Sequence, residues 1–587
     1  MTARALLILV VTGLLSAADA RAATWVEARS PHFTVYSDAG EKQARRAAWQ
    51  FEQIRESLVR LWPWATSELG APVIVYAARD EHSMRALVPS YYEGRNAVRP
   101  TSVFYSVDYG HYITLRLDAG TRGEPNVNPF INSYWSYVAL VLRTNIPQEL
   151  PPWMFRGMAE VFSNTIVGDD AILVGPVIPW HLQTLRSHAR PALSELLGAD
   201  RSSPYLTNGD RLEVFDASAW ALVHFLMFGN EGKHIPVFNH FADAVRLGGR
   251  PNELVMTEYG GETALRNGLA RYIDQSLFVY QKWQTAVAVD GSRFPVRTLP
   301  AADAAVVLAR LHAVTGRPAE ARAQLATAGD TPAAAEVEGL LLDREKKFDD
   351  AKRAYARASE AGAATHYGEY RLASLSWPRG DAATPEDFEP IVGLLRRSVE
   401  RYPSYAPAYR LLADALVRLD RGTEALGAAQ RAVTIAPRDP YSHLSLARAY
   451  WSLSKAAEAT AAANKSLSLA SSEAETGSAR QFLEFLAKSP TRQAVQLAAS
   501  TGKALSAEDV KRLYSECYRG DDDACARLVP MFEEACAAGR EQGCVMMGFL
   551  YVEGRGVAKD HAKARTILQP LCDRGTQEAC RILNTIK

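Results

Sequence analysis

The side chains whose spacing most clearly indicates chemistry are the six cysteines of this 587-residue chain. All of them follow residue 516 and form three pairs with the same separation of eight residues: Cys517/Cys525, Cys536/Cys544 and Cys572/Cys580. Eight residues fit the end of one helix, a turn and the start of the next, so each pair can close one helical hairpin with a disulfide. Six cysteines allow 15 pairings, and the repeated spacing favours these three. Zinc binding is the alternative, but there is no Cys-x-x-Cys and only His561 lies nearby.

A second segment has the layout of a metal site without its ligands. A zinc peptidase helix carries two histidines at i and i+4 with a glutamate base between them, and a later helix supplies a third ligand. Here the histidine positions hold Trp135 and Ala139, the base position holds Ser136, and the third-ligand position holds Arg156. None of these groups is a metal ligand, and a permanent guanidinium charge repels a cation. We therefore predict no catalytic residue, no metal and no cofactor. The alternative is that 131–144 is an ordinary apolar helix.

Three flanking segments connect this layout to a known family. They are Trp25–Asp38, the Pro152-Trp153 and Gly157-Met158-Ala159-Glu160 motifs, and Ser218–Leu226. In that order they resemble the opening strand, the third-ligand helix and the following helix of bacterial secreted peptidase-MA-like (gluzincin) domains. The resemblance covers residues 25–285 and implies a zincin-like fold with a former active-site cleft. Activity does not carry over, because only Glu160 remains of the acidic residues, and in the family it is not the zinc ligand.

No other group of residues replaces the lost site. His234 and His240 are six residues apart, about 120° around a helix, so they do not face one metal. His224 lies in an apolar run and is predicted to pack in the core. No nucleophile elbow, P-loop or dinucleotide fingerprint is present. Ser136 as a nucleophile would need a partner base that the sequence does not identify.

The first 22 residues are typical of an export signal. Arg4 supplies the positive charge, Ala5 to Leu15 the apolar region, and Ala20-Arg21-Ala22 a small-x-small cleavage site. No cysteine follows the junction, and no later run is long enough to span a bilayer. We expect a periplasmic or secreted bacterial protein. Lys plus Arg equals Asp plus Glu at 66 each, so no overall basic field is present to bind nucleic acid or anionic lipid.

Composition divides the chain near residue 290. Tryptophan and other aromatic residues are concentrated before this point and alanine after it, and Ala288 to Pro300 is predicted to be a linker. The first half contains short strand patterns, including a half-buried strand over His111 to Asp118, with Asn128-Pro129 expected to start a helix. Strands followed by helices indicate an α+β domain over residues 23–287.

A period of 34 residues follows the predicted linker. It is clearest between Tyr402-Pro403 and Ala436-Pro437, where the small and large positions match tetratricopeptide repeats. Related units begin at 302, 332 and 440, and an insertion at Ser376–Asp381 breaks the period over 366–401. Such hairpins bury their apolar faces only by stacking. Residues 301–490 are therefore predicted to form a curved array that binds a protein or peptide, or one that only supports the first domain.

The last segment, 505–587, combines the paired cysteines with a Gly-rich word. Between Cys544 and Cys580, the Gly554-Arg555-Gly556-Val557 word looks like a Sel-type repeat, a relative of the tetratricopeptide repeat with a longer loop. Both glycines are predicted to need positive φ. With the paired cysteines, the segment resembles bacterial cysteine-rich repeat proteins, which implies protein–protein interaction at the cell envelope.

These features together predict a multidomain protein. It has an α+β zincin-like N-terminal domain that is inactive, followed by an all-α helical-hairpin repeat solenoid with a disulfide-stapled end. We interpret it as an exported, non-catalytic scaffold or adaptor for a protein or peptide. The competing interpretations are an active hydrolase with a misaligned or unrecognised site, and a purely structural spacer.

Overall fold

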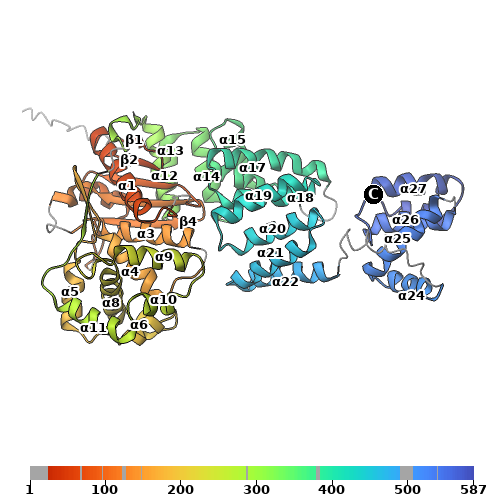
Figure 1. Cartoon of the computed structure of the whole chain (residues 1–587). Helices are drawn as coiled ribbons and strands as arrows, with labels where there is room; N and C mark the ends of the chain where they lie inside the picture. Colours follow the sequence, from red (N-terminus) through yellow and green to blue (C-terminus); the bar gives the residue numbers. More distant parts are fainter. Residues whose placement is uncertain are drawn as a thin grey trace, which may run out of the picture.

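The computed structural model describes residues 24–65, 69–95, 97–121, 127–146, 148–285, 289–378, 384–488, 507–537 and 540–586. Figure 1 shows an N-terminal part built around a sheet, then an array of helices, then a further group of helices. The expected export signal lies outside the described residues. None of the described helices combines the length and apolar character that a membrane crossing requires.

A six-stranded mixed sheet organises the N-terminal part, with the strand order β4-β5-β3-β2-β1-β9. Its strands are β1 (Val26–Arg29), β2 (Phe33–Ser37), β3 (Val73–Ala78), β4 (Ser102–Val107), β5 (Gly110–Arg116) and β9 (Val296–Thr298). Strands β2, β3 and β5 are parallel, and the outer pairings are antiparallel. The expected single opening strand is therefore a β1–β2 hairpin.

Two predictions about this sheet are wrong. The expected linker over 288–300 contains β9, whose Val296, Arg297 and Thr298 pair with β1, so this segment belongs to the sheet. The strand expected to be half-buried, β5, is buried along its whole length. Ile113 and Leu115 face one core, whereas Tyr112 faces a second core on the opposite side. The alternation of polar and apolar residues did not reveal that helices cover both faces.

Helices from different parts of the chain cover the two faces. Helices α1 (Glu41–Leu61) and α3 (Ile131–Asn145) pack on one face. On the other face, Tyr76 and Tyr112 pack with residues of α2 (Glu81–Leu87) and of the first array helices, α12–α14. The 3₁₀ turns η1 (Pro89–Tyr91) and η2 (Leu117–Thr121) lie between strands and helices. The start of the array is thus one layer of the N-terminal fold.

The helical half of the N-terminal part surrounds α8 (Gly209–Phe228), which is buried on almost all sides. The remaining elements are α4 (Pro152–Ser163), α5 (Pro179–Ser187), α6 (Leu193–Gly198), α7 (Pro204–Thr207), α9 (Ile235–Arg246), α10 (Pro251–Glu258) and α11 (Glu262–Asp274). A small sheet, β6-β7-β8, joins Ile166–Val167, Ala171–Val174 and Gln281–Gln284. The η3 turn (Gly291–Arg293) precedes β9. Gly157 of α4 lies against the backbone of Ala219 in α8, where a Cβ would collide.

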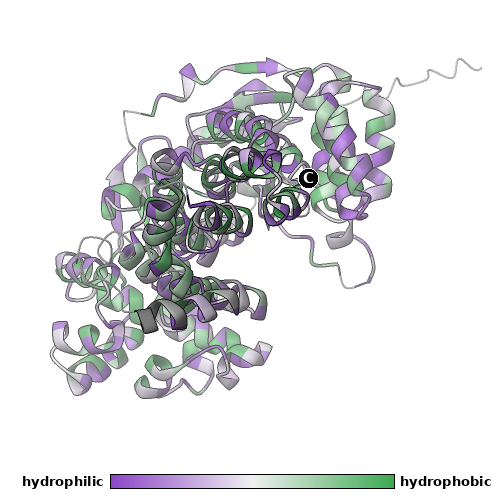
Figure 2. Cartoon of the chain, turned by 90° about the vertical axis from the view of Figure 1, so that its right-hand side faces the viewer, coloured by the Kyte–Doolittle hydropathy of each residue, from purple (hydrophilic) through white to green (hydrophobic). Residues whose placement is uncertain are grey.

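The array consists of five helical hairpins and one further helix within the described residues. The pairs are α12 (Ala301–Val314)/α13 (Pro318–Ala328), α14 (Pro332–Arg344)/α15 (Phe348–Glu360), α16 (His366–Leu375)/α17 (Glu389–Arg401), α18 (Ala406–Arg418)/α19 (Gly422–Ile435) and α20 (Pro440–Ser452)/α21 (Ala456–Leu469), followed by α22 (Glu473–Lys488). The region predicted to break the period instead forms a hairpin, α16/α17, with η4 (Pro385–Phe388) before its second helix. The insertion therefore lengthens one connection without interrupting the stacking. In Figure 2 the helices of the chain carry both apolar and hydrophilic residues.

Over the described residues 507–537 and 540–586, the C-terminal unit has its own core and five helices: α24 (Ala507–Tyr518), α25 (Asp522–Ala537), α26 (Glu541–Glu553), α27 (His561–Asp573) and α28 (Gln577–Leu583). Its disulfides are those that the spacing favours, Cys517–Cys525, Cys536–Cys544 and Cys572–Cys580, each across one helix–helix turn. Gly554 and Gly556 have φ of 73° and 65°, which agrees with the need for positive φ. The α26–α27 turn, which contains these glycines, has no disulfide.

Candidate functional site

Helices α3 and α4 lie side by side and carry all five residues of the expected former site. Asn128 does not cap α3 as predicted, because Phe130 occupies the cap position. Its side-chain amide instead donates to the carbonyl oxygens of Ser163 and Thr165, each at 3.0 Å. Asn128 therefore ties the start of α3 to the end of α4.

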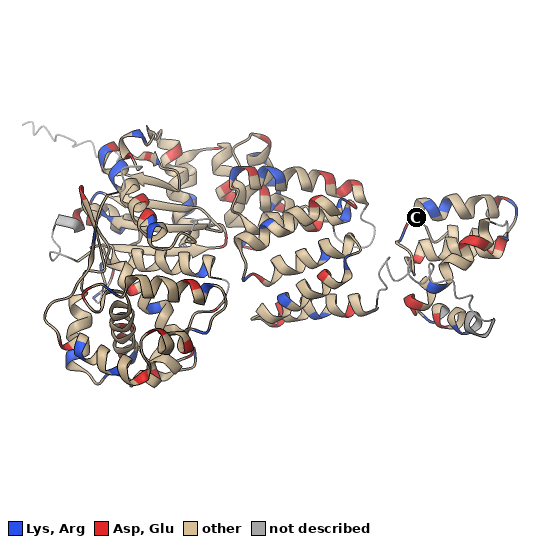
Figure 3. Ribbon diagram, in the orientation of Figure 1, with Lys and Arg blue, Asp and Glu red and all other residues tan. Residues whose placement is uncertain are grey.

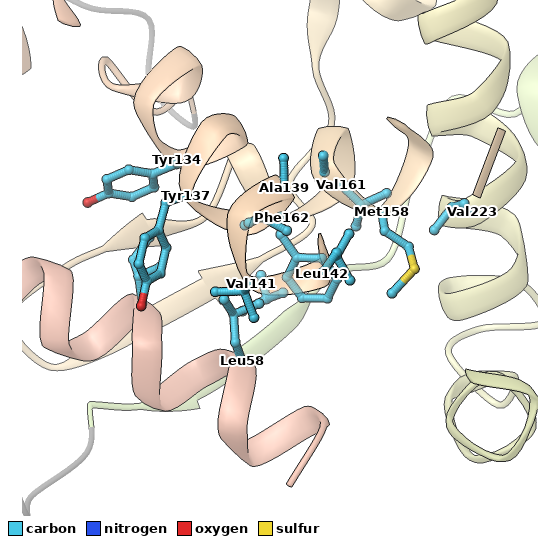
Figure 4. Close-up of a cluster of buried hydrophobic side chains, with 14 of the residues drawn as sticks. Leu58, Tyr134, Tyr137, Ala139, Val141, Leu142, Met158, Val161, Phe162 and Val223 are labelled. Atoms are coloured by element: carbon cyan, nitrogen blue, oxygen red, sulfur yellow. The ribbon is translucent and has the colours of Figure 1, made fainter. Parts of the chain in front are cut away.

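Two of the five residues point away from any shared site. Ala139 is 3% exposed and belongs to the apolar cluster between α1, α3, α4 and α8. Figure 4 shows it in that cluster, together with Tyr134, Tyr137, Val141, Leu142, Met158, Val161, Phe162, Val223 and Leu58. The Ser136 hydroxyl donates to the Asn132 carbonyl of the same helix at 2.9 Å. In this arrangement Ser136 forms a local helix bond and is not joined to a base.

Trp135 and Arg156 do come together. The Arg156 guanidinium carbon lies 5.5 Å from the centre of the Trp135 ring, which also packs edge-on against Phe155. Arg156 forms a two-pronged ion pair with Asp216 of α8, and its Nη2 donates to Oδ2 at 2.6 Å. Burial disfavours the Arg156 cation, but the hydrogen-bonded carboxylate of Asp216 outweighs it and raises the pKa of the guanidinium. A protein carboxylate thus balances the positive charge at the third-ligand position.

Glu160 has a separate partner. Its Oε2 lies 3.0 Å from His181 Nε2 of α5, and the two side chains are only 14% and 9% exposed. His181 also packs against Trp220, with ring centres 5.7 Å apart. The Glu160 carboxylate is also close enough to Arg156 and Asp216 to interact with them electrostatically. The former-site region is therefore a set of mutually paired polar side chains that joins α4, α5 and α8.

Sequence reasoning did not identify Asp216 or His181 as partners. Asp216 is 60 residues from Arg156 along the chain, and His181 is 21 residues from Glu160. One signal was present: Asp216 is a carboxylate between Phe215 and Ala217, at the start of the apolar part of α8 and two positions before Ser218. Such a residue requires a buried cation or donor, although its identity depends on how α4 and α8 pack.

The histidines considered for metal binding have other partners. His224 is fully buried, as predicted, with its ring nitrogens 2.7 Å from Tyr272 Oη and from the Gly175 carbonyl oxygen. His234 Nδ1 lies 3.1 Å from the Phe225 carbonyl oxygen, and His240 Nδ1 lies 3.4 Å from Glu258. Within the described ranges, no group of three or more His, Cys, Asp or Glu side chains is placed to hold a metal ion.

Two surface cavities of about 550 Å³ lie in the helical half. One is lined along α5 and the segment before it by Val177, Pro179, Leu182, Gln183, Arg186 and Ser187. The other lies between α8 and α11 and is lined by residues that include Phe225, His234, Glu258, Tyr259 and Arg271. Neither cavity is lined by a residue of the expected former site.

The array has a junction with the sheet, formed by Leu69, Tyr76 and Tyr109 on the sheet side and Val307, Tyr367 and Tyr402 on the array side. The Tyr109 ring, in the turn between β4 and β5, stacks on Tyr367 of α16 with centres 4.0 Å apart. The hydroxyls of Tyr76 and Tyr402 donate to the carbonyls of Val307 and Leu69 at 2.8 and 2.9 Å. The N-terminal part therefore contacts the array at α12, at α16 and at Tyr402 just after α17.

Farther along the array, α18, α20 and α22 carry a second group of exposed or half-buried side chains, which we call the distal surface. It consists of Arg410 and Asp414 on α18, Tyr441, Arg448 and Trp451 on α20, and Phe482 and Phe485 on α22. Arg448 pairs with Asp414 at 2.8 Å and lies over Phe482 at 6.0 Å. Arg410 lies 5.2 Å from the centre of the Tyr441 ring. Arginine and aromatic residues of this kind are enriched in protein interfaces.

Comparison with known proteins identifies no family. No family model matches this chain, and no curated protein matches its sequence. Among solved structures, YrrB, described as a TPR protein with an unusual peptide-binding site, is 16% identical, with 30% of this chain and 90% of YrrB covered and a TM-score of 0.26. A signal transduction ATPase with a tetratricopeptide repeat sensor, from Pyrococcus horikoshii, is 11% identical, with 95% and 91% covered and a TM-score of 0.22. TM-scores this low support no inference about function.

Proposed function

We propose that this chain is an exported, non-catalytic scaffold whose helical array binds a protein or peptide, and whose N-terminal part is a pseudopeptidase that supports the array. The distal surface is the observation that carries this proposal. Half-buried aromatic and arginine side chains lie together there on three neighbouring helices. Stacked helical hairpins present such side chains on an extended surface suited to a partner chain.

Three further observations support the non-catalytic and exported parts of the proposal. The third-ligand position is held by an arginine whose charge is already balanced by Asp216. The three disulfides are typical of an oxidising compartment. In the part of the chain that the structure describes, acidic and basic residues are interspersed, without a region of one sign that would indicate nucleic acid binding (Figure 3).

Site-specific photo-crosslinking in the organism that encodes the protein tests the scaffold function. A benzophenone amino acid at Tyr441, within the distal surface, is expected to give discrete adducts. The matched control is the same amino acid at Phe348, which is 42% exposed at the start of α15. No adduct from Tyr441, or the same adducts from both positions, would contradict a binding role for this surface.

Zinc content tests the pseudopeptidase part separately. The mature protein, incubated with zinc and desalted, is expected to retain no metal. An Arg156→Glu variant is the comparison, because it restores a carboxylate at the third-ligand position. One tightly bound zinc per natural chain would favour the hydrolase alternative. In that case Glu160→Gln would be tested for loss of peptidase activity, since Glu160 and His181 form the paired acid and base of this region.

A further inference from the structure

The cavity between α8 and α11 lies on the side of α8 that faces away from the expected former site. Val223 of α8 lies against Gly157 of α4, whereas Phe225, two positions later, lies against Gly268 of α11. Two positions turn a helix by about 200°, so these contacts are on opposite sides of α8. The volume of the cavity, about 550 Å³, is typical of a small-molecule binding site. The cavity is therefore a candidate site that is separate from the former peptidase layout.

Aromatic rings that contact one another form a wall of this cavity. The His234 ring packs edge-on against Phe225 and Tyr259, with ring centres 5.4 Å apart in both cases. The Phe225 ring centre in turn lies 5.3 Å from that of Tyr272. Gly268 permits this arrangement, because a Cβ there would lie 2.7 Å from the Phe225 ring. The wall is suited to an apolar or aromatic group of a ligand.

The polar atoms of this wall are bonded within the protein. The Tyr259 hydroxyl donates to the Leu226 carbonyl at 2.8 Å, and the Tyr272 hydroxyl lies 2.7 Å from His224 Nδ1. His234 Nδ1 also has a backbone carbonyl as its partner. The wall therefore offers a ligand mainly ring surfaces, and recognition of a charged ligand depends on the charged residues that line the cavity.

Two residues of opposite charge line the same cavity: Glu258, which ends α10, and Arg271, in the last turn of α11. Arg271 is exposed and forms no ion pair with any residue that the structure describes. Glu258 lies 3.4 Å from the exposed His240, and this contact is an ion pair only when the imidazole is protonated. Arg156 and Asp216, in contrast, balance each other at the former site. The charges of the cavity are therefore available to a ligand.

We propose that the cavity between α8 and α11 binds a small zwitterion of the amino-acid or short-peptide class. The ligand carboxylate pairs with Arg271, its ammonium group pairs with Glu258, and its apolar side chain lies on the wall formed by Phe225 and Tyr259. A guanidinium is well suited to a carboxylate, and aromatic rings beside a glutamate also favour an ammonium group. The cavity and the distal surface share no residue, so this inference does not depend on the proposed scaffold function.

Isothermal titration calorimetry of the mature full-length chain tests this ligand class. The probes are L-phenylalanine, phenylalanylglycine and glycylphenylalanine, which carry the same groups with different distances between the two charges. At least one of them is expected to give saturable binding at a single site per chain. The N-acetylated and C-amidated forms of the tightest probe each lack one charge. Each form is expected to bind at least about fivefold more weakly, because a charge-assisted hydrogen bond is lost.

Substitutions assign each ligand charge to its protein partner. The Arg271→Gln variant should bind the tightest probe about as weakly as the natural chain binds the amidated form, and amidation should have no further effect on this variant. Glu258→Gln should remove the effect of acetylation in the same way. Ala264→Trp places an indole at an exposed position of the cavity lining and should weaken the binding of every probe.

Matched controls lie on the same helix but do not line the cavity. Arg266→Gln, Glu262→Gln and Ala270→Trp change exposed residues of α11. Each is expected to change the affinity less than about twofold. The proposal would be overturned if no probe gave saturable binding, or if the acetylated and amidated forms bound as tightly as the parent probe. Equal losses of affinity in the variants and in their controls would also overturn it.

Discussion

The array and the C-terminal unit are both built from helical hairpins, yet different interactions close them. The first hairpin of the array packs directly on the sheet, so a large α/β core covers its open end. The C-terminal unit has its own small core, and a disulfide closes three of its four helix–helix turns. A stack of hairpins needs its exposed ends protected, and a short stack without a neighbouring core depends on cross-links. The same motif is therefore stabilised by burial in one region and by covalent bonds in the other.

The largest expected effect comes from reducing the disulfides. Each closes a loop of about eight residues and contributes about 2–3 kcal/mol, so the three together approach the whole stability of a unit this size. We expect reductant to unfold residues 507–586 while 301–488 stay protected, as measured by hydrogen exchange with mass spectrometry. The buried Cys517–Cys525 bridge should be reduced last. Equal loss of protection in both regions would show that the C-terminal unit does not depend on its disulfides more than the array does.

The next effect is at a buried ion pair within the first hairpins of the array. Glu336 is 1% exposed, pairs with Arg310 at 3.3 Å and accepts hydrogen bonds from the Thr365 backbone and hydroxyl at 2.7 and 2.6 Å. Glu336→Ala leaves the Arg310 charge buried without its partner, which should cost about 3–5 kcal/mol. Glu338→Ala, two positions away and 52% exposed, is the control and should cost less than about 1 kcal/mol. Chemical denaturation measures the free energy of unfolding of both variants. Similar losses would show that the buried Glu336–Arg310 pair does not stabilise this region.

As the pH falls, the part of the fold that contains His111, His312 and His366 should lose stability before the C-terminal unit does. Burial lowers the pKa of His111, His312 and His366 to about 4, against about 6.5 in an unfolded chain. These imidazoles stay neutral when folded, so their stability contribution is present above pH 6.5 and is lost as the pH falls toward 4. The loss by pH 5 is about 2 kcal/mol for each.

The C-terminal unit contains only the exposed His561, so its melting temperature should change less between pH 7 and pH 5. Hydrogen exchange at both pH values, resolved by region, makes the comparison. His111→Gln removes one of the titrating imidazoles. The free energy of unfolding of this region should then depend on pH with a slope that is smaller by one proton. An unchanged slope in this variant would mean that His111 is already protonated in the folded protein.

The smallest effect concerns the one turn of the C-terminal unit without a disulfide. Gly556 has φ of 65°, and a Cβ there would lie 2.5 Å from the Ala526 backbone nitrogen. Gly556→Ala should cost about 1–3 kcal/mol through strain and this contact. Gly575→Ala, with φ of 91° and open space around it, isolates the strain alone and should cost less. Thermal melts of residues 507–586 within the full chain compare the two variants, and equal losses would show that packing at this turn is unimportant.

Much of the local structure could be predicted. Helix α1 (Glu41–Leu61) is an example, because its apolar spacing repeats with the helical turn. The strand pattern over His111 to Asp118 located β5 but not the burial of both its faces, because the alternation of Tyr112 and Ile113 looks the same whether water or a helix covers the tyrosine. The expected linker failed for a related reason: Val296–Thr298 is too short to be distinguished from a loop until β1 lies beside it.

The candidate site also has features that the sequence could predict and features that it could not. The residue types at Trp135, Ser136, Ala139 and Arg156 were sufficient to predict that no zinc ligands stand there, and that prediction awaits the metal measurement. Their partners were not predictable. Asp216 reaches Arg156 across the contact of α4 with α8, where Gly157 allows the helices to approach closely, whereas His181 reaches Glu160 from α5.

The sequence by itself determined the features that depend on nearby residues: the helices, the 34-residue period, the disulfide pairing across eight residues, and the glycines with positive φ. Only the tertiary structure decided that the array begins as a layer of the N-terminal fold, that Tyr109 rests on Tyr367, and that Arg156 is balanced by Asp216. These contacts join residues that are distant in the chain. Their formation depends on how whole helices and strands pack, and no local pattern encodes that packing.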